Sequence, residues 1–244
     1  MSRAGATDGA GRLWGVGLGP GDPELLTLKA HRVIRAADVV AYPALPHGDS
    51  LARRIAAAAD AIAPGSRELP ITVPMTRERA PAQAAYDRAA EAIAAELAAG
   101  RRVVVLCEGD PFLYGSFMYL HARLAGRFAV EVIPGVTSVS AAAARAGRPL
   151  VARNEVLTLL PATLGDAALA ARLAGAEAAA ILKLGRHLPR LRALLERLGL
   201  AARTLYVERV SMAGAERILP LAEAPEAAPY FSLLLVSKGA DPWL

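Results

Sequence analysis

The chain has 244 residues, of which 54% are hydrophobic and 21% charged, so it has the composition of a folded globular protein and not of a disordered or fibrous one. The 28 Lys and Arg residues outnumber the 23 Asp and Glu residues, which gives a formal net charge of +5. This balance favours anionic partners and excludes neither a small polyanion nor a nucleic acid. The length allows one large domain or two small ones.

Cys107 is the single cysteine, so the chain has no internal disulfide, and its apolar neighbours predict a buried strand end. Residues 1–10 lack the apolar core of a signal peptide and are expected to form a flexible tail. No apolar run approaches the length of a membrane span, about 18 residues. We therefore predict a cytoplasmic protein with no membrane segment.

The first half of the chain alternates short apolar runs with amphipathic stretches. The runs end at Gly or Pro and predict buried strands at 13–18, 38–42, 103–107 and 129–133. The stretches predict helices at 24–36, 50–62, 81–99 and 136–146, with Ser50 as an N-cap. This alternation predicts an α/β fold with a mainly parallel sheet.

A break at Gly147, Arg148 and Pro149 precedes a new series of elements, so we expect two α/β domains, at 11–152 and 153–244. The second series predicts strands at 156–160, 178–182 and 204–208 and helices at 164–174 and 188–198. A final hairpin is expected to pair 217–219 with 231–236.

A glycine-rich turn from Gly15 to Asp22 follows the first predicted strand. It fails the dinucleotide pattern G-x-G-x-x-G, because Pro20 or Asp22 stands where the last glycine is needed. Pro20 has no N–H, and Asp22 would repel a phosphate. The loop therefore indicates close backbone approach, although a tight turn with Asp22 capping a helix is the alternative.

Two further loops follow predicted strands. Glu108-Gly109-Asp110-Pro111 places two carboxylates at the carboxyl end of a strand, which suits an amine, a ribose or a sulfonium; Asp110 alternatively caps a helix starting near Pro111. Pro134 to Ser138 offers hydroxyl and N–H groups at a helix start. Because all three loops follow strands in one half of the chain, we expect them to meet at one crevice.

Other chemistries have no support in the sequence. The four histidines are scattered and no Cys/His group has metal-ligand spacing, so we expect no metal site. The G-x-S-x-G motif of serine hydrolases and the P-loop of nucleotide triphosphatases are both absent.

Together, the three loops resemble the signature of the tetrapyrrole methylases, from about Leu13 to Val236. The subgroup that methylates precorrin-2 at C20 is the most similar, on the stretches 16–30, 39–43, 108–117 and 230–236. The resemblance implies two α/β domains with S-adenosylmethionine folded into the cleft between them, and a homodimer. It also implies cofactor-binding roles for Pro20, Glu108, Gly109, Asp110, Leu113, Thr137, Ser138 and Leu184.

A further cofactor contact is implied near Glu208 to Val210, where the Glu-Asn-Gly pattern of the family reads Glu-Arg-Val. C20 methylation gives precorrin-3A in cobalamin biosynthesis and S-adenosylhomocysteine as the second product. The C20 proton must leave, and Glu108 and Tyr114 are the candidate bases by loop position. Precorrin-2 carries several carboxylates, which the excess of arginines could bind. The candidate substrate-binding residues are Arg12, Arg77, Arg79 and Arg153.

Several alternatives stay open. The substrate could be the cobalt complex of the anaerobic route, or the methylated position could be C11 or C17. A ribosomal-RNA methylase is disfavoured, because the chain lacks a Lys-rich stripe with interleaved aromatic residues, and we expect no nucleic-acid partner. From another class, the protein could be a non-catalytic module that binds S-adenosylmethionine.

Overall fold

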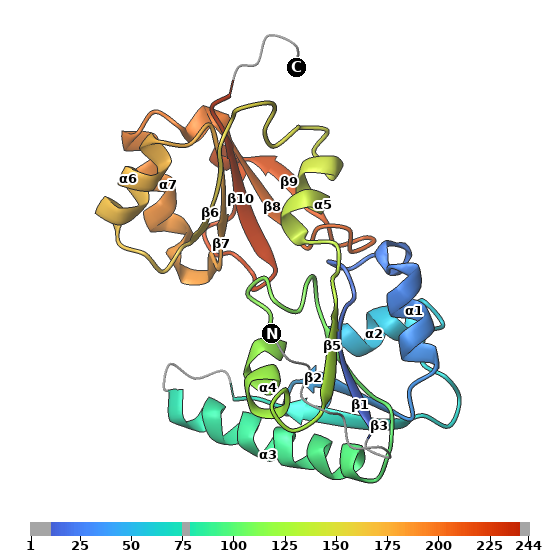
Figure 1. The fold of residues 1–244 in the computed structure, drawn as a ribbon. Helices are drawn as coiled ribbons and strands as arrows, with labels where there is room; N and C mark the ends of the chain where they lie inside the picture. The colour runs from blue at the N-terminus through green and yellow to red at the C-terminus, as the bar shows by residue number, and fades with distance from the viewer. Residues whose placement is uncertain (1–10, 75–78, 240–244) are drawn as a thin grey trace. The chain divides into compact units, whose positions relative to one another are not determined.

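The computed structural model describes residues 11–74 and 79–239, which form two compact units that divide between Thr137 and Ser138 (Figure 1). The sequence pattern placed the division later, near residue 152. Helix α5 (Ser138–Arg145) explains the difference, because it packs against a strand of the second sheet. The Gly147 to Pro149 break is thus a turn inside the second unit. Both units interleave helices with a five-stranded sheet, which confirms the α/β class.

The first unit contains a wholly parallel sheet in the order β3-β2-β4-β1-β5. Its strands are β1 (Arg12–Gly17), β2 (Val39–Ala44), β3 (Arg67–Thr72), β4 (Val103–Cys107) and β5 (Ala129–Ile133). Central strands of a parallel sheet are covered on both faces, which explains why β4 is apolar at every position. Parallel pairing also places the carboxyl ends of the strands at one edge.

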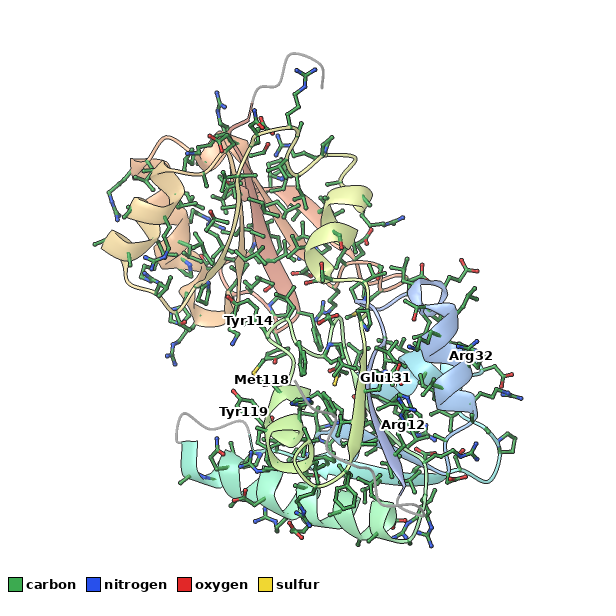
Figure 2. The ribbon with its side chains drawn as sticks, in the orientation of Figure 1. Arg12, Arg32, Tyr114, Met118, Tyr119 and Glu131 are labelled. Carbon is green, nitrogen blue, oxygen red and sulfur yellow. The ribbon has the colours of Figure 1, made fainter. Side chains whose placement is uncertain are left out.

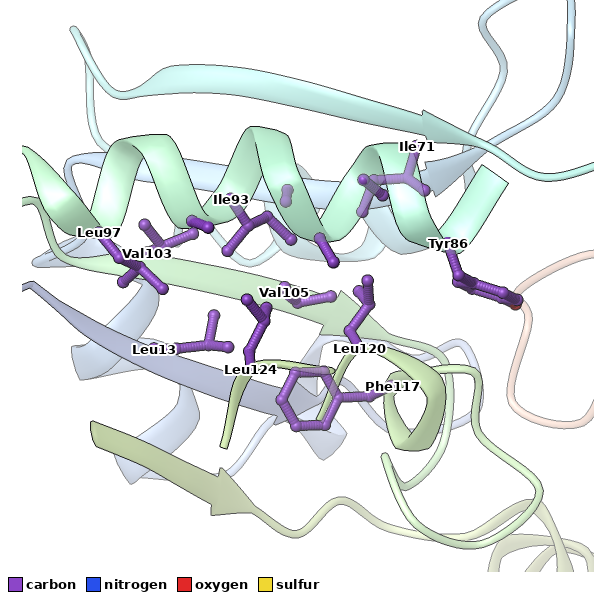
Figure 3. Packing of buried hydrophobic residues seen from close by; sticks show 14 of the residues in the cluster. Leu13, Ile71, Tyr86, Ile93, Leu97, Val103, Val105, Phe117, Leu120 and Leu124 are labelled. Atoms are coloured by element: carbon purple, nitrogen blue, oxygen red, sulfur yellow. The ribbon is translucent and has the colours of Figure 1, made fainter. Parts of the chain in front are cut away.

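Helices cover both faces of this sheet. They are α1 (Leu28–Arg35), α2 (Leu51–Ala58), α3 (Arg79–Ala98) and α4 (Phe117–Leu124). The side chains of β4 alternate between two cores: Val103, Val105 and Cys107 pack with α3 and α4, whereas Val104 and Leu106 pack with α1 and α2. Figure 3 shows the first of these cores, with Phe117 and Leu120 of α4 beside Val105.

The predicted elements of the first half are mostly confirmed, with three differences. Helix α4 (Phe117–Leu124) was not among the predicted helices. Strand β3 was not predicted, because it carries Pro70 and its side chains are mostly polar or half-exposed. The proline is tolerated in this strand because β3 lies at the edge of the sheet. The helix expected at 24–36 is interrupted, with a 3₁₀ turn at Pro23–Leu25 and α1 starting only after the N-cap Thr27.

The second unit has a mixed sheet in the order β6-β7-β10-β8-β9, with helices α5, α6 (Asp166–Ala174) and α7 (Leu188–Arg197). Its strands are β6 (Leu157–Pro161), β7 (Ala178–Leu182), β8 (Thr204–Glu208), β9 (Arg217–Pro220) and β10 (Ser232–Ser237). The predicted pairing of 217–219 with 231–236 is wrong, since β9 pairs with β8 and β10 lies between β7 and β8. Buried residues from Leu233 to Val236 require that central place.

Candidate active site

The loops that follow β1 and β4 are joined by backbone hydrogen bonds. The Leu18 N–H donates to the Cys107 carbonyl at 2.9 Å, and the Gly109 N–H donates to the Gly19 carbonyl at 2.7 Å. Gly19 returns a longer bond to the Gly109 carbonyl, 3.3 Å. The two loops therefore extend the pairing of their strands past the edge of the sheet.

Asp110 links the second loop to the third. Its Oδ1 accepts hydrogen bonds from the N–H groups of Phe112 and Leu113, at 2.9 and 3.1 Å, and its Oδ2 accepts one from the Gly135 N–H at 3.0 Å. The predicted helix start near Pro111 is wrong, because α4 begins only at Phe117. Asp110 thus organises a turn and bridges two loops.

Three glycines, one from each loop, bring the backbones into direct contact. A Cβ atom added to Gly135 would lie 2.1 Å from the Gly109 carbonyl oxygen and 2.9 Å from the Gly17 Cα. A Cβ on Gly17 would lie 2.6 Å from the Gly135 nitrogen. No side chain fits at these two positions, so Gly17, Gly109 and Gly135 form a glycine junction. The three loops are therefore in contact within the first unit, as the sequence predicts.

Glu108 stands beside the glycine junction and points toward α2. Burial raises the pKa of the Glu108 carboxyl, while hydrogen bonds from the backbone N–H groups of Glu108 and of Ala52, in the first turn of α2, partly offset the rise. Tyr114, the other candidate base, is exposed and holds a positive φ of 56°. That backbone conformation is uncommon outside glycine and is often found at functional sites.

The charge of the loops fits a cationic ligand. Residues 15–22, 108–117 and 134–138 contain three acidic residues, Asp22, Glu108 and Asp110, and no Lys or Arg. Thr137 and Ser138 add half-buried hydroxyl groups, Leu113 is half-buried, and Pro20 is buried. Carboxylate, hydroxyl and backbone groups of this kind suit the ammonium, ribose and sulfonium groups of S-adenosylmethionine.

In the second unit, the predicted residues lie at one edge of the sheet. Leu184 follows β7 and is fully buried in the core, and Glu208 ends β8 and is also buried. Strand β10 pairs with both β7 and β8, so the two strand ends are neighbours across it. Lys183 and Arg209, which follow these strands, both hold positive φ angles, 62° and 47°.

Of the four arginines considered for the substrate, the structure describes the side chains of Arg12 and Arg153. Arg12 begins β1, at the edge opposite the glycine junction, and contacts Glu131 at 2.7 Å (Figure 2). Arg153 is exposed and precedes β6, at the edge opposite Leu184. Arg77 lies outside the described residues, and Arg79 begins α3 with a side chain that is not described.

Sequence reasoning identified the loops but missed their mutual contacts. Gly17 and Gly135 were each part of a motif, yet no sequence pattern indicates that residues 118 positions apart touch each other. Their shared feature, a glycine two or fewer residues beyond a buried strand, was the available signal.

Within residues 11–74 and 79–239, no cluster of His, Cys, Asp and Glu residues could hold a metal ion, and no helix is long and apolar enough to cross a membrane.

Comparison with known proteins assigns the class. Residues 12–225 match the model of the tetrapyrrole (corrin/porphyrin) methylases, and the chain belongs to this family. A solved cobalt precorrin-4 methyltransferase shares the fold, with a TM-score of 0.72 and 21% identity over 93% of this chain and 94% of that one. Uroporphyrin-III C-methyltransferase from Thermus thermophilus, complexed with S-adenosyl homocysteine, gives a TM-score of 0.65 and 30% identity over 93% and 98%.

Individual relatives narrow the comparison. The chain is 48% identical to precorrin-2 C(20)-methyltransferase of Sinorhizobium sp, over 96% of this chain and 98% of that protein. It is 31% identical to cobalt-precorrin-2 C(20)-methyltransferase of Salmonella typhimurium, over 93% and 97%. Cobalamin biosynthesis protein CobIJ of Mycobacterium bovis is 50% identical over 94% of this chain, which spans about half of that protein, 46%.

We expect Gly135→Ala to disrupt the glycine junction. The new methyl group would overlap the Gly109 carbonyl, and overpacking of this kind costs about 1–3 kcal/mol. The melting temperature should fall by about 3–10 °C, and the Kd for S-adenosylmethionine should rise at least about tenfold, because the loops separate. Calorimetry, by differential scanning and by titration, measures both values.

Gly126→Ala is the matched control, since a Cβ there meets nothing within 4 Å. It should leave both the melting temperature and cofactor affinity at wild-type values. A Gly135→Ala protein that matches this control would contradict the close contact of the three loops.

The raised pKa of Glu108 predicts a pH-dependent effect of Glu108→Gln. A carboxyl whose pKa is higher in the folded than in the unfolded protein stabilises the fold fully below about pH 4.5, and this contribution is lost as pH rises through the folded-state pKa. The variant, which cannot ionise, should therefore gain melting temperature relative to wild type between pH 5 and pH 8. If the melting temperatures of Glu108→Gln and wild type differ by the same amount at pH 5 and at pH 8, the Glu108 carboxyl is not desolvated.

Proposed function

We propose that this protein is an S-adenosylmethionine-dependent methyltransferase that methylates precorrin-2 at C20 to give precorrin-3A in cobalamin biosynthesis. The observation that carries the proposal is 48% identity, along nearly the whole of both chains, to a protein of that name. The acidic loops around the glycine junction support it independently, because they provide a site for a cationic cofactor.

The nearest alternative is C20 methylation of the cobalt complex. The 31% identity to the Salmonella enzyme is well below the 48% identity to the Sinorhizobium enzyme, which favours the metal-free substrate. A non-catalytic S-adenosylmethionine-binding module is a second alternative, which a turnover assay distinguishes.

The residues that hold the cofactor are proposed from the loops. Gly109, Leu113 and Thr137 would line the site in the first unit, with Pro20 as an apolar contact and Ser138 next to Thr137 in the chain. The role of Leu184, which lies in the second unit, stays a prediction of the family resemblance. Asp110 already accepts three backbone N–H groups, so it contributes by fixing loop shape as well as by charge. When bound, S-adenosylmethionine supplies an electrophilic methyl group on a sulfonium.

The protein contributes mainly by alignment and exclusion of water. C20 of the tetrapyrrole forms the new carbon–carbon bond, the methyl–sulfur bond breaks with its electron pair left on sulfur, and the C20 proton must then be accepted. We assign this proton to Glu108, whose raised pKa makes its ionised form a stronger base, with exposed Tyr114 as the alternative acceptor.

The homodimer stays a prediction of the family resemblance, and the cytoplasmic location stays a prediction from the single cysteine and from residues 1–10. Light scattering on the purified protein checks the first, with an expected mass twice the 25.4 kDa of one chain. A mass of one chain at micromolar concentration would contradict it.

Anaerobic incubation with S-adenosylmethionine and enzymatically generated precorrin-2, followed by mass spectrometry, tests the function. We expect one added methyl group, mapped to C20 by NMR, and a faster reaction than with the cobalt complex. Glu108→Gln should slow turnover at least about tenfold at saturating S-adenosylmethionine, as expected for loss of a general base.

Preference for the cobalt complex would place the enzyme in the anaerobic route. Cofactor binding without methylation of either substrate would reject the C20 function, and later corrinoid intermediates and RNA would be tried next. Cofactor binding without methylation of any tetrapyrrole would favour the non-catalytic module.

A further inference from the structure

A pair of arginines surrounds a buried carboxylate at the edge of the second sheet. Glu208 ends β8, Arg209 follows it, and Arg217 begins β9 directly opposite Glu208 in the antiparallel register. The Nη1 atoms of Arg209 and Arg217 lie 3.4 and 3.6 Å from the same oxygen of Glu208, Oε1.

Glu208 is anchored from the interior. Its side chain is only 4% exposed, and its second oxygen, Oε2, accepts a hydrogen bond from the hydroxyl of Tyr206, which is fully buried. Burial, and then the hydrogen bond to Glu208, raise the pKa of the Tyr206 hydroxyl, so it stays a donor at neutral pH. The carboxylate is therefore held in one orientation, facing the two arginines.

One carboxylate does not balance two guanidinium groups. Arg209 and Arg217 keep 45% and 50% of their side-chain surface exposed, and their distances to Glu208 exceed the 2.7–3.2 Å usual for a strong hydrogen bond. A net positive charge and exposed N–H donors therefore remain. Such a pair suits a second carboxylate, which guanidinium groups bind in a forked geometry.

The loop that carries Arg209 is constrained. Arg209 holds a φ of 47° and Ser211 a φ of 61°, both unfavourable for these residue types. The Arg209 N–H donates to the Phe231 carbonyl at 2.8 Å, and the Ser211 N–H donates to Glu216, which also contacts Arg145 at 2.7 Å. Strain maintained by surrounding contacts is typical of residues that serve a ligand.

An aromatic pair adjoins the arginines. Phe231, bonded to Arg209 through the backbone, meets Tyr230 edge-to-face with ring centroids 5.0 Å apart, and the two residues are 36% and 72% exposed. Exposed rings next to unneutralised positive charge match a ligand that is both flat and anionic. A carboxylated tetrapyrrole has both properties.

We propose that Arg209 and Arg217 bind one carboxylate side chain of the tetrapyrrole substrate, with Glu208 holding both guanidinium groups in place. The proposal rests on the proposed function and adds the residues that select its substrate. We propose this pair as substrate-binding residues in place of Arg12 and Arg153. Arg12 lies at the edge of its sheet opposite the glycine junction, and Arg153 lies at the edge of its sheet opposite Leu184.

Two substitutions test the pair. Arg209→Asn removes the charge and introduces a residue that tolerates positive φ, and Arg217→Gln removes the second charge. Each should raise the KM for precorrin-2 about tenfold, in keeping with the loss of a charge-assisted hydrogen bond. The Kd for S-adenosylmethionine should stay unchanged in Arg217→Gln, because Arg217 lies outside the segment 208–210 that the family resemblance assigns to the cofactor. The melting temperature of Arg209→Asn should equal or exceed that of wild type, which a purely structural Arg209 would not allow.

Arg172→Gln is the matched control, because Arg172 is exposed and donates only within its own helix, to the Ala168 carbonyl at 3.3 Å, among the contacts described. It makes the same change in charge and should leave the KM for precorrin-2 unaltered. An equal KM in wild type, Arg209→Asn and Arg217→Gln would overturn the arginine pair and leave the proposed function standing.

Absence of methylated product from the wild-type protein would instead overturn the proposed function. In that case, tetrapyrrole affinity is measured as the Kd of uroporphyrin III, a stable tetrapyrrole with carboxylates around its ring. Weaker uroporphyrin binding in the two variants than in Arg172→Gln would support the arginine pair, and equal binding or none would overturn it.

Discussion

Direct contact between backbones at Gly17, Gly109 and Gly135 is the constraint on which the candidate active site depends. Because parallel strands end at the same edge of the sheet, the three loops start close together, but side chains on their contacting residues would keep them apart. Removing the Cβ atoms allows the loops to touch, and the Asp110 carboxylate then holds the third loop against the second. The polar groups offered to a ligand are thereby fixed by the main chain and not by mobile side chains.

The two units carry opposite charge at their functional edges. The loops of the first unit are acidic and contain no basic residue, whereas the edge of the second sheet carries Arg209 and Arg217 around one buried carboxylate. A methyl transfer from a sulfonium to a polyanionic tetrapyrrole requires both kinds of recognition. In the proposed function, the acidic loops recognise the sulfonium and the arginine pair recognises a carboxylate of the tetrapyrrole.

The sequence predicted most elements, because buried strands are short apolar runs that stand out between helices and turns. Strands β4, β5, β7 and β8 have the predicted bounds. Prediction from the sequence failed where the tertiary structure determines the strand or its partners. Strand β3 is an edge strand that contains a proline, and the partners of β10 depend on how the other strands of the sheet are arranged. The loop positions and their meeting could be predicted from the local pattern, whereas the particular atoms in contact, at the glycine junction and around Glu208, depend on the tertiary structure.

The position of β10 affects how the chain can fold during synthesis. The first unit is assembled from a continuous stretch up to Thr137, so all its strands have left the ribosome well before translation ends. The second unit lacks its middle strand until Ser237 has emerged, because β7 and β8 pair with β10 and not with each other. Until then β7 can pair only with β6 and β8 only with β9, so one hydrogen-bonding edge of each strand has no partner and the second sheet is the later of the two to be completed.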